Sequence, residues 1–285
     1  PMQHGTVLLS FNGEIYNHNE LRLALAPFPW KTFSDAEVLL AAYERWGINC
    51  VNHLEGMFAF AIKDGDTLYL ARDRFGKKPL YYMHTGLQFI FGSEIKALKL
   101  FLKSNNLNLD ALQSYLSFLA PTPPHTFYEG IYKLESGEWL EFKYNNIRKQ
   151  SYYSIVNTPK SLLSNIENIA ITLEEELHRS IASRLNTSAS TAALLSGGLD
   201  SAMICAISAH QGKRLPTYTL GYSEYENYDE RQNASKTAKH LGLEHTEIIL
   251  SKENFHDRLD TILDHMDEPL NDPAVLPLYF LMDAV

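Results

Sequence analysis

Cysteine is scarce in this sequence, with only Cys50 and Cys205 among 285 residues. The two lie far apart, and neither belongs to a spacing that is typical of a zinc site. A disulfide framework would need more cysteines than this. We therefore expect both to be structural thiols.

Long apolar runs and blocks of like charge are also absent. No stretch approaches the roughly 20 apolar residues of a transmembrane helix, and no signal-peptide pattern opens the chain. Acidic residues outnumber basic ones by 34 to 25, so the net charge is −9, without a single-sign cluster. This pattern indicates a solvated acidic surface with no nucleic-acid or membrane partner. We expect a cytoplasmic protein.

Both ends lack the usual boundary signals. After Pro1 the chain enters the apolar run Val7-Leu8-Leu9 almost at once, and it stops at Val285 within an apolar, helix-like segment that has no cap. We therefore expect the sequence to be incomplete at both ends.

The length allows two domains, and three stretches of different character follow one another. Residues 1–104 mix short strand patterns with helical ones, and Asp64-Gly65 between apolar runs predicts a hairpin. Residues 105–160 are interpreted as a connector with an interdomain hairpin around 131–142. In residues 161–285, helix, strand, glycine loop and helix alternate, which favours a parallel α/β sheet. The helical patterns of the first stretch cover 19–25 and 34–46.

A glycine pair, Gly197-Gly198, lies between an apolar strand pattern and the start of a helix. Glycine permits close backbone approach, and the free N–H groups of a helix start can then bind an anion. No Gly-Lys-Ser/Thr follows, so the loop is not of the Walker A type. A plain glycine turn between strand and helix is the alternative.

The segment Ser196-Gly197-Gly198-Leu199-Asp200-Ser201 resembles the pyrophosphate loop of the ATP-pyrophosphatase superfamily. The resemblance implies ATP and Mg²⁺ as cofactors, with Asp200 as the Mg²⁺ ligand. It also implies that Leu194 and Leu220 lie near adenine, although an ordinary core position is the alternative for each. The residues that would hold pyrophosphate are Ser196, Gly197, Gly198 and Ser201.

Four segments of the first stretch resemble, in order, the class II N-terminal-nucleophile glutamine amidotransferase domain. They are Phe11–Asn17, Ser34–Glu37, Leu54–Phe60 and Arg72–Tyr82. Joined to the pyrophosphate loop, they resemble the glutamine-hydrolysing asparagine synthetase family over nearly the whole chain. The implied fold is a truncated α+β N-terminal-nucleophile sandwich domain followed by a truncated α/β parallel-sheet ATP-pyrophosphatase domain.

The resemblance also implies roles for residues at the first segment. The side-chain amide of Asn12 and the backbone N–H of Gly13 would form an oxyanion hole for glutamine hydrolysis. Asn12, Glu14 and Asp35 would bind glutamine. The alternatives are a turn residue for Asn12 and a helix N-cap for Asp35. Arg72 and the aspartate after it are expected to form an ion pair within the fold.

The family's nucleophile is a cysteine at the mature N-terminus, and no cysteine of this chain matches it. As written, the chain should not hydrolyse glutamine. For the parent enzyme, the resemblance implies that ammonia from glutamine is channelled to an aspartate activated by ATP, which yields asparagine. The alternatives are amidation of another carboxylate and a non-catalytic descendant that lost the nucleophile. The oligomeric state stays open, with a homodimer as the candidate.

Overall fold

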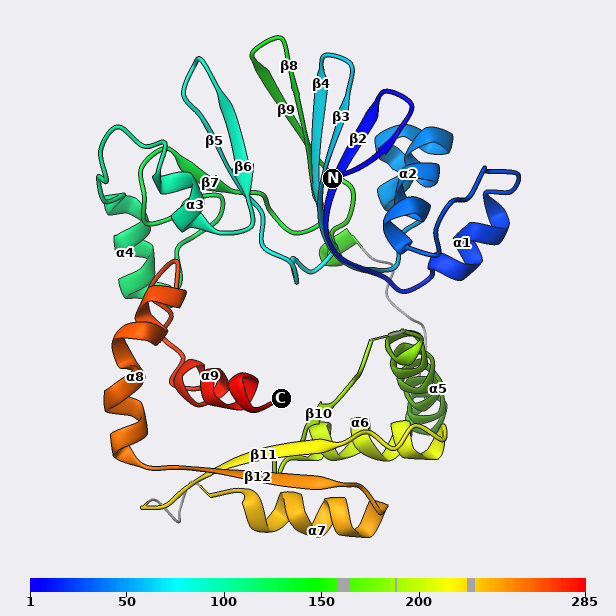
Figure 1. Cartoon of the computed structure of the whole chain (residues 1–285), viewed down its shortest axis with the longest axis vertical. Helices are drawn as coiled ribbons and strands as arrows, with labels where there is room; N and C mark the ends of the chain where they lie inside the picture. Colours follow the sequence, from blue (N-terminus) through cyan, green and yellow to red (C-terminus); the bar gives the residue numbers. More distant parts are fainter. Residues whose placement is uncertain (158–164, 188, 225–228) are drawn as a thin grey trace. The chain divides into compact units, whose positions relative to one another are not determined.

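The computed structural model describes residues 1–157, 165–187, 189–224 and 229–285. The chain divides into two compact units, Pro1–Lys160 and Ser161–Val285 (Figure 1). Within the described residues, no helix combines the length and the apolar character that crossing a membrane requires.

The first unit contains a six-stranded antiparallel sheet with the strand order β1-β2-β3-β4-β8-β9 (Figure 1). The strands β3 and β4 are joined at Asp64-Gly65, so the hairpin predicted there is confirmed. The strands are β1 (Met2–His4), β2 (Val7–Ile15), β3 (Gly56–Asp64), β4 (Thr67–Arg72), β8 (Glu138–Lys143) and β9 (Asn146–Ser151).

A second, three-stranded sheet has the order β6-β5-β7. Its strands are β5 (Tyr81–His84), β6 (Phe89–Gly92) and β7 (Ile131–Lys133). The described helices of this unit are α1 (His18–Ala24), α2 (Asp35–Trp46), α3 (Ile95–Lys99) and α4 (Leu109–Phe118), with short 3₁₀ helices at Gly47–Asn52 and Ile155–Asn157. The bounds of α1 and α2 agree within one residue with the patterns at 19–25 and 34–46.

Three apolar clusters show how these elements are layered. In the first, Leu39 of α2 packs with Leu9 and Phe60 of the six-stranded sheet. In the second, residues of both sheets meet, including Ala61 and Leu140 of one and Tyr82 of the other. The third joins the small sheet to α3 and contains Met83 and Leu98. The order helix, sheet, sheet, helix confirms the predicted sandwich.

The strands of residues 131–142 differ from the prediction. The expected hairpin does not form, because β7 pairs with β5 in the small sheet while β8 pairs with β4 and β9 in the large one. The hairpin of this region is β8–β9. Residues interpreted as a connector therefore supply strands to both sheets of the first unit.

The second unit contains a parallel sheet with the order β10-β11-β12, as predicted (Figure 1). Cys205 of α6 and the alanines Ala234 and Ala238 of α7 pack with Ala193 and Leu195 at β10. Its elements are α5 (Ile166–Leu185), β10 (Ala193–Leu194), α6 (Leu199–His210), β11 (Thr217–Tyr222), α7 (Arg231–Leu241), β12 (His245–Leu250), α8 (Lys252–His265) and α9 (Val275–Ala284).

The side chains of Arg72 and Asp73 are both buried in the first unit. The Asp73 carboxylate accepts hydrogen bonds from the backbone N–H groups of Phe58, Phe75, Lys77 and Lys78 at 3.0–3.2 Å. The Arg72 guanidinium donates to the carbonyl oxygens of Gly76, Lys78 and Leu134 at 2.6–2.8 Å. The expected ion pair between the two side chains is therefore wrong, because each charge is satisfied by backbone groups instead.

Asp73→Ala should destabilise the first unit, because it leaves four backbone N–H groups without their acceptor. We expect the free energy of unfolding to fall by about 2–4 kcal/mol. All three tryptophans, Trp30, Trp46 and Trp139, lie in this unit, so tryptophan fluorescence during urea unfolding reports on it alone. Asp66→Ala, at an exposed turn, is the control and should shift stability by less than about 0.5 kcal/mol. An unchanged unfolding midpoint for Asp73→Ala would contradict the assignment.

Candidate functional site

Asn12 and Gly13 lie inside strand β2 and not in a turn. Both are paired with β3, Asn12 opposite Ala59 and Gly13 opposite Phe58. A Cβ atom at Gly13 would lie 2.2 Å from the carbonyl oxygen of Met57, so only glycine fits there. The turn alternative for Asn12 is wrong, because the neighbouring strand continues the ladder through this dipeptide.

The two faces of β2 have different surroundings. Leu9 and Ile15 are buried in the cluster beneath α2, whereas Asn12 and Glu14 alternate onto the opposite face. Asn12 lines a cavity of about 210 Å³ together with Ser93 and apolar side chains of both sheets. Its Nδ2 donates a hydrogen bond to Ser93 Oγ at 3.3 Å.

The Asp35 side chain is hydrogen-bonded to the end of the same strand. Its Oδ2 accepts the backbone N–H of Ile15 at 3.0 Å. The N-cap of α2 is Ser34, whose hydroxyl accepts the backbone N–H of Ala36, so the N-cap alternative for Asp35 is wrong. The fold therefore gathers Asn12, Gly13 and Glu14 with Asp35 at one end of β2.

Glu37 is a buried residue that sequence reasoning missed at this place. Its carboxylate accepts hydrogen bonds from the backbone N–H groups of Lys31 and Thr32 and from the Thr32 hydroxyl, at 2.7–2.8 Å. Burial raises the pKa of Glu37, but these hydrogen bonds and nearby Arg22 outweigh burial and lower the pKa overall. The Ser34-x-x-Glu37 spacing of a capping box was the available signal. The glutamate fixes the loop that leads into Asp35.

The glycine loop of the second unit is held by its own serines. The Ser196 and Ser201 hydroxyls lie 2.9 Å apart, and Ser201 Oγ accepts the backbone N–H of Ser196 at 3.1 Å. Gly198 is the N-cap of α6 and provides no side-chain cap. The first N–H groups of α6 thus have no side-chain acceptor at the cap position, as an anion-binding helix start requires.

A carboxylate missed by the sequence reasoning lies at this loop. Glu230 Oε2 accepts the backbone N–H of Gly197 at 3.3 Å. A Cβ atom at Gly197 would lie 3.1 Å from the Cβ of Asn233, so the first turn of α7 packs closely against the loop. A carboxylate oxygen therefore occupies an N–H group that could bind a phosphate oxygen.

Leu194 and Leu220 lie on one face of the parallel sheet. Leu194 is opposite Tyr218, and Leu220 follows two residues later on the same strand. The other face carries Ala193, which is buried with α6 and α7. Leu194 is 41% exposed, so the core alternative is wrong for this residue, whereas Leu220 is half-buried.

Asp200 is exposed in the first turn of α6. Across the part of the chain that the structure describes, no group of three or more His, Cys, Asp or Glu side chains could hold a metal ion. Among the described residues, the predicted Mg²⁺ ligand Asp200 thus has no cluster of such side chains around it, and Mg²⁺ bound there would take its remaining ligands from phosphate and water, as Mg²⁺ usually does.

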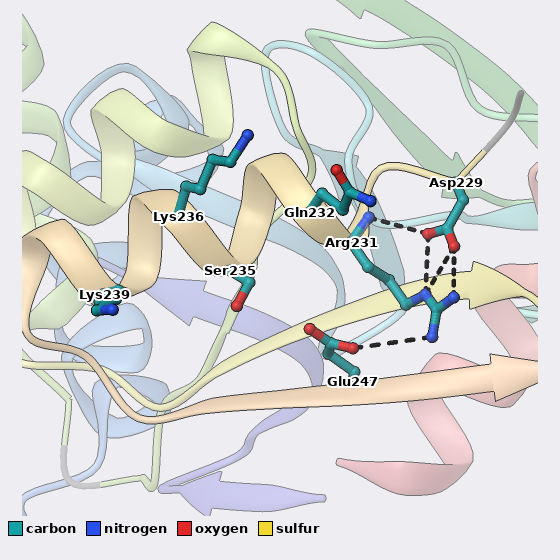
Figure 2. A pocket seen from close by; sticks show the side chains of 7 residues that line it. All are labelled: Asp229, Arg231, Gln232, Ser235, Lys236, Lys239 and Glu247. Carbon is teal, nitrogen blue, oxygen red and sulfur yellow. Dashed lines mark hydrogen bonds and ion pairs between the residues drawn. The ribbon is translucent and has the colours of Figure 1, made fainter. Parts of the chain in front are cut away.

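A separate cavity of about 480 Å³ lies between α7 and β12, and Figure 2 shows its lining side chains. Arg231 Nε lies 2.8 and 2.9 Å from the two oxygens of Asp229, and its Nη1 is 3.8 Å from Glu247 Oε2. The hydrogen bond from Arg231 lowers the pKa of Asp229. None of the residues predicted to bind ATP lines this cavity. Its arginine is matched by two carboxylates, which indicates a structural role.

Comparison with known families decides the identity of the first unit. Residues 1–153 match the glutamine amidotransferase domain model, and this match covers more than half of the chain. The chain belongs to this family. Residues 172–285 match the asparagine synthase model, so the amidotransferase domain is joined to a second domain as in glutamine-hydrolysing asparagine synthetases.

Curated relatives show the same combination. The chain is 34% identical to asparagine synthetase [glutamine-hydrolyzing] 1 of Bacillus subtilis, over 97% of this chain and 44% of the relative. It is 29% identical to a putative asparagine synthetase of Methanocaldococcus jannaschii, over 98% of this chain and 55% of the relative. Amidase chry2 of Gibberella zeae is 28% identical over 99% of this chain and 45% of the relative. The chain thus spans about half the length of the curated relatives it matches.

Neither cysteine of the amidotransferase chain is placed to react. Cys50 is fully buried in the cluster beneath α2, and burial raises its pKa to about 12. Cys205 is 1% exposed, and burial raises its pKa as well. A thiol reacts as the thiolate, so both are inert at neutral pH. The expectation of structural thiols is confirmed.

We predict that an aromatic disulfide reagent at pH 8 will label neither thiol of the native 285-residue chain. Both thiols should react once the chain is unfolded in guanidinium chloride, because unfolding exposes them and restores an ordinary pKa. The measurement is the absorbance of the released thiolate, with Cys50→Ala as the control that halves the final signal. Rapid release of one equivalent from the native chain would show that a cysteine is accessible.

Proposed function

We propose that the protein is an ATP-dependent asparagine synthase that uses glutamine as its nitrogen donor. The observation that carries the proposal is the presence, in one chain, of two groups of residues that match the predicted sites. One is the cluster of Asn12, Gly13, Glu14 and Asp35 at the end of β2, and the other is the glycine loop at the start of α6. The matches to the two family models support it.

In the first site, glutamine would bind with its α-amino group near Glu14 and Asp35, which supply negative charge. The Asn12 amide and the Gly13 N–H would stabilise the oxyanion formed when the glutamine amide is attacked. We assign the nucleophile to neither Cys50 nor Cys205, since both are buried. The products of this step are glutamate and ammonia.

In the second site, ATP would lie with its pyrophosphate on Ser196, Gly197, Gly198 and Ser201. Adenine would contact the half-exposed face formed by Leu194 and Leu220. Mg²⁺ on Asp200 would neutralise charge on the phosphates. The N–H group of Gly197 donates to no phosphate oxygen while it is bonded to the Glu230 carboxylate, so this carboxylate would have to leave when ATP binds. The side-chain carboxylate of aspartate would attack the α-phosphate of ATP and release pyrophosphate. Ammonia would then attack the resulting acyl adenylate, which forms asparagine and releases AMP.

A second candidate function is amidation of a carboxylate other than aspartate. The similarity to Amidase chry2 over 99% of this chain favours it, because that protein shares both regions of the match but carries another name. Comparing aspartate with other carboxylates as acceptors for the complete protein separates the two. Cytoplasmic location and homodimer assembly stay predictions from the sequence.

We expect Asp200→Asn in the complete protein to reduce aspartate-dependent pyrophosphate release by about 10²-fold or more, because several kcal/mol of charge stabilisation are lost with the metal ligand. Glutamine hydrolysis should continue. Pyrophosphate release and glutamate formation are measured in parallel. Unaltered pyrophosphate release would refute the Mg²⁺ assignment.

We expect Asn12→Ala to lower kcat for glutamine-dependent synthesis by about 10²–10³-fold, which is the usual cost of one oxyanion donor. Synthesis driven by free ammonia should be unaffected, because ammonia bypasses the first site. The rates with the two nitrogen donors are compared on the same preparation. Equal losses with both donors would count against an oxyanion role.

A further inference from the structure

We propose that Ser93 is a positioning residue for Asn12, and that its hydroxyl holds the Asn12 side-chain amide in the orientation that binds the oxyanion. The inference rests on the proposed function of the first site. It starts from one contact, the hydrogen bond from Asn12 Nδ2 to Ser93 Oγ at 3.3 Å.

This hydrogen bond joins the two sheets of the sandwich. Asn12 belongs to β2 in the large sheet, and Ser93 directly follows β6 in the small sheet (Figure 1). The two residues are 81 positions apart in the sequence. Ser93 is therefore a support that comes from outside the strand carrying the predicted oxyanion hole.

The chain is held in place both before and after Ser93. Gly92, before Ser93, is paired with Tyr81 in the small sheet. Ile95, two residues after Ser93, is fully buried at the start of α3. A short segment anchored at both ends keeps the Ser93 hydroxyl in place, which a positioning residue requires.

Asn12 and Ser93 also share one cavity, and its other walls are largely apolar. Ala59, Ala61, Leu80 and Phe91 contribute to them. In such surroundings the two polar side chains are natural partners for the amide group of a substrate. An oxyanion formed there would be stabilised by an N–H group that is already held in place.

The chemistry explains why the amide needs a partner. The torsion at the end of an asparagine side chain is broad and roughly two-fold, so rotation exchanges the N–H₂ group for the carbonyl oxygen. An amide oxygen directed at an oxyanion would repel it. With Nδ2 toward Ser93, one N–H is bonded to the hydroxyl and the second N–H is left for the oxyanion. Fixing this orientation in advance removes the cost of rotation during the reaction.

The test is Ser93→Ala in the complete protein. A neutral hydrogen bond of this kind should change kcat for glutamine-dependent synthesis by roughly 2- to 10-fold. The KM for glutamine and the rate with free ammonia should be unchanged. Ser93→Thr keeps a hydroxyl and should restore most of kcat. Thr85→Ala removes a hydroxyl hydrogen bond at the other end of the β5–β6 hairpin and should leave both rates unchanged.

The double variant Asn12→Ala/Ser93→Ala decides between positioning and an independent role. If Ser93 acts through Asn12, the double variant should be no slower than Asn12→Ala alone. A further 2- to 10-fold loss in the double variant would overturn the proposal. A raised KM with unchanged kcat for Ser93→Ala would overturn it too, because Ser93 would then bind glutamine directly.

A measurement without activity separates this inference from the proposed function. The side-chain amide signals of Asn12 in ¹⁵N-labelled protein, assigned with Asn12→Ala, should shift in Ser93→Ala and not in Thr85→Ala. Unchanged signals would overturn the positioning role whatever the enzyme does. Shifted signals in a protein that shows no glutamine-dependent turnover would instead refute the proposed function and leave the Asn12–Ser93 contact established.

Discussion

The backbone hydrogen bonds of Arg72 and Asp73 hold the two sheets of the amidotransferase domain together. Asp73 binds β3 through the N–H of Phe58 and also binds the loop that leads to β5. Arg72 reaches the carbonyl oxygen of Leu134, just after β7. Charged groups without partners are costly to bury, so both side chains require this complete set of backbone partners. These hydrogen bonds therefore fix the segment that leads from β4 in the large sheet to β5 in the small one.

The passage of the chain from the large sheet to the small one determines what the inner face of β2 meets. The strand buries Leu9 and Ile15 against α2 and directs Asn12 toward the other sheet. Its pairing with β3 leaves no room for a side chain at two positions, since Cβ atoms at Gly13 and Gly56 would each lie 2.2 Å from a carbonyl oxygen of the facing strand. The predicted oxyanion hole is therefore built on a paired strand, which is more rigid than a loop.

In the second unit, alanines allow the elements to pack closely. Small side chains, Ala193, Ala234 and Ala238, let α7 pack tightly beside β10 and the glycine loop. This packing brings the Glu230 carboxylate to the Gly197 N–H, where we propose that ATP binds. The cavity lined by Arg231 lies on the other side of α7 and is more highly charged, but its arginine is already paired with Asp229 and Glu247.

The sequence by itself determined the features that depend on neighbouring residues. The periodicity of α1 and α2, the Asp64-Gly65 hairpin, the parallel sheet and the glycine loop before α6 were predictable, because local patterns specify them. The amidotransferase domain was predictable only through the resemblance of four segments to a family, and the family match confirmed that domain.

Only the tertiary structure decided the rest. Asn12-Gly13 carries a turn signal but continues a strand, because β3 supplies the partner; β7 and β8 adjoin in sequence but enter different sheets. The contact between Asn12 and Ser93 spans 81 positions. Each of these depends on pairing between distant segments, and the energy of such pairing is absent from any short stretch of sequence.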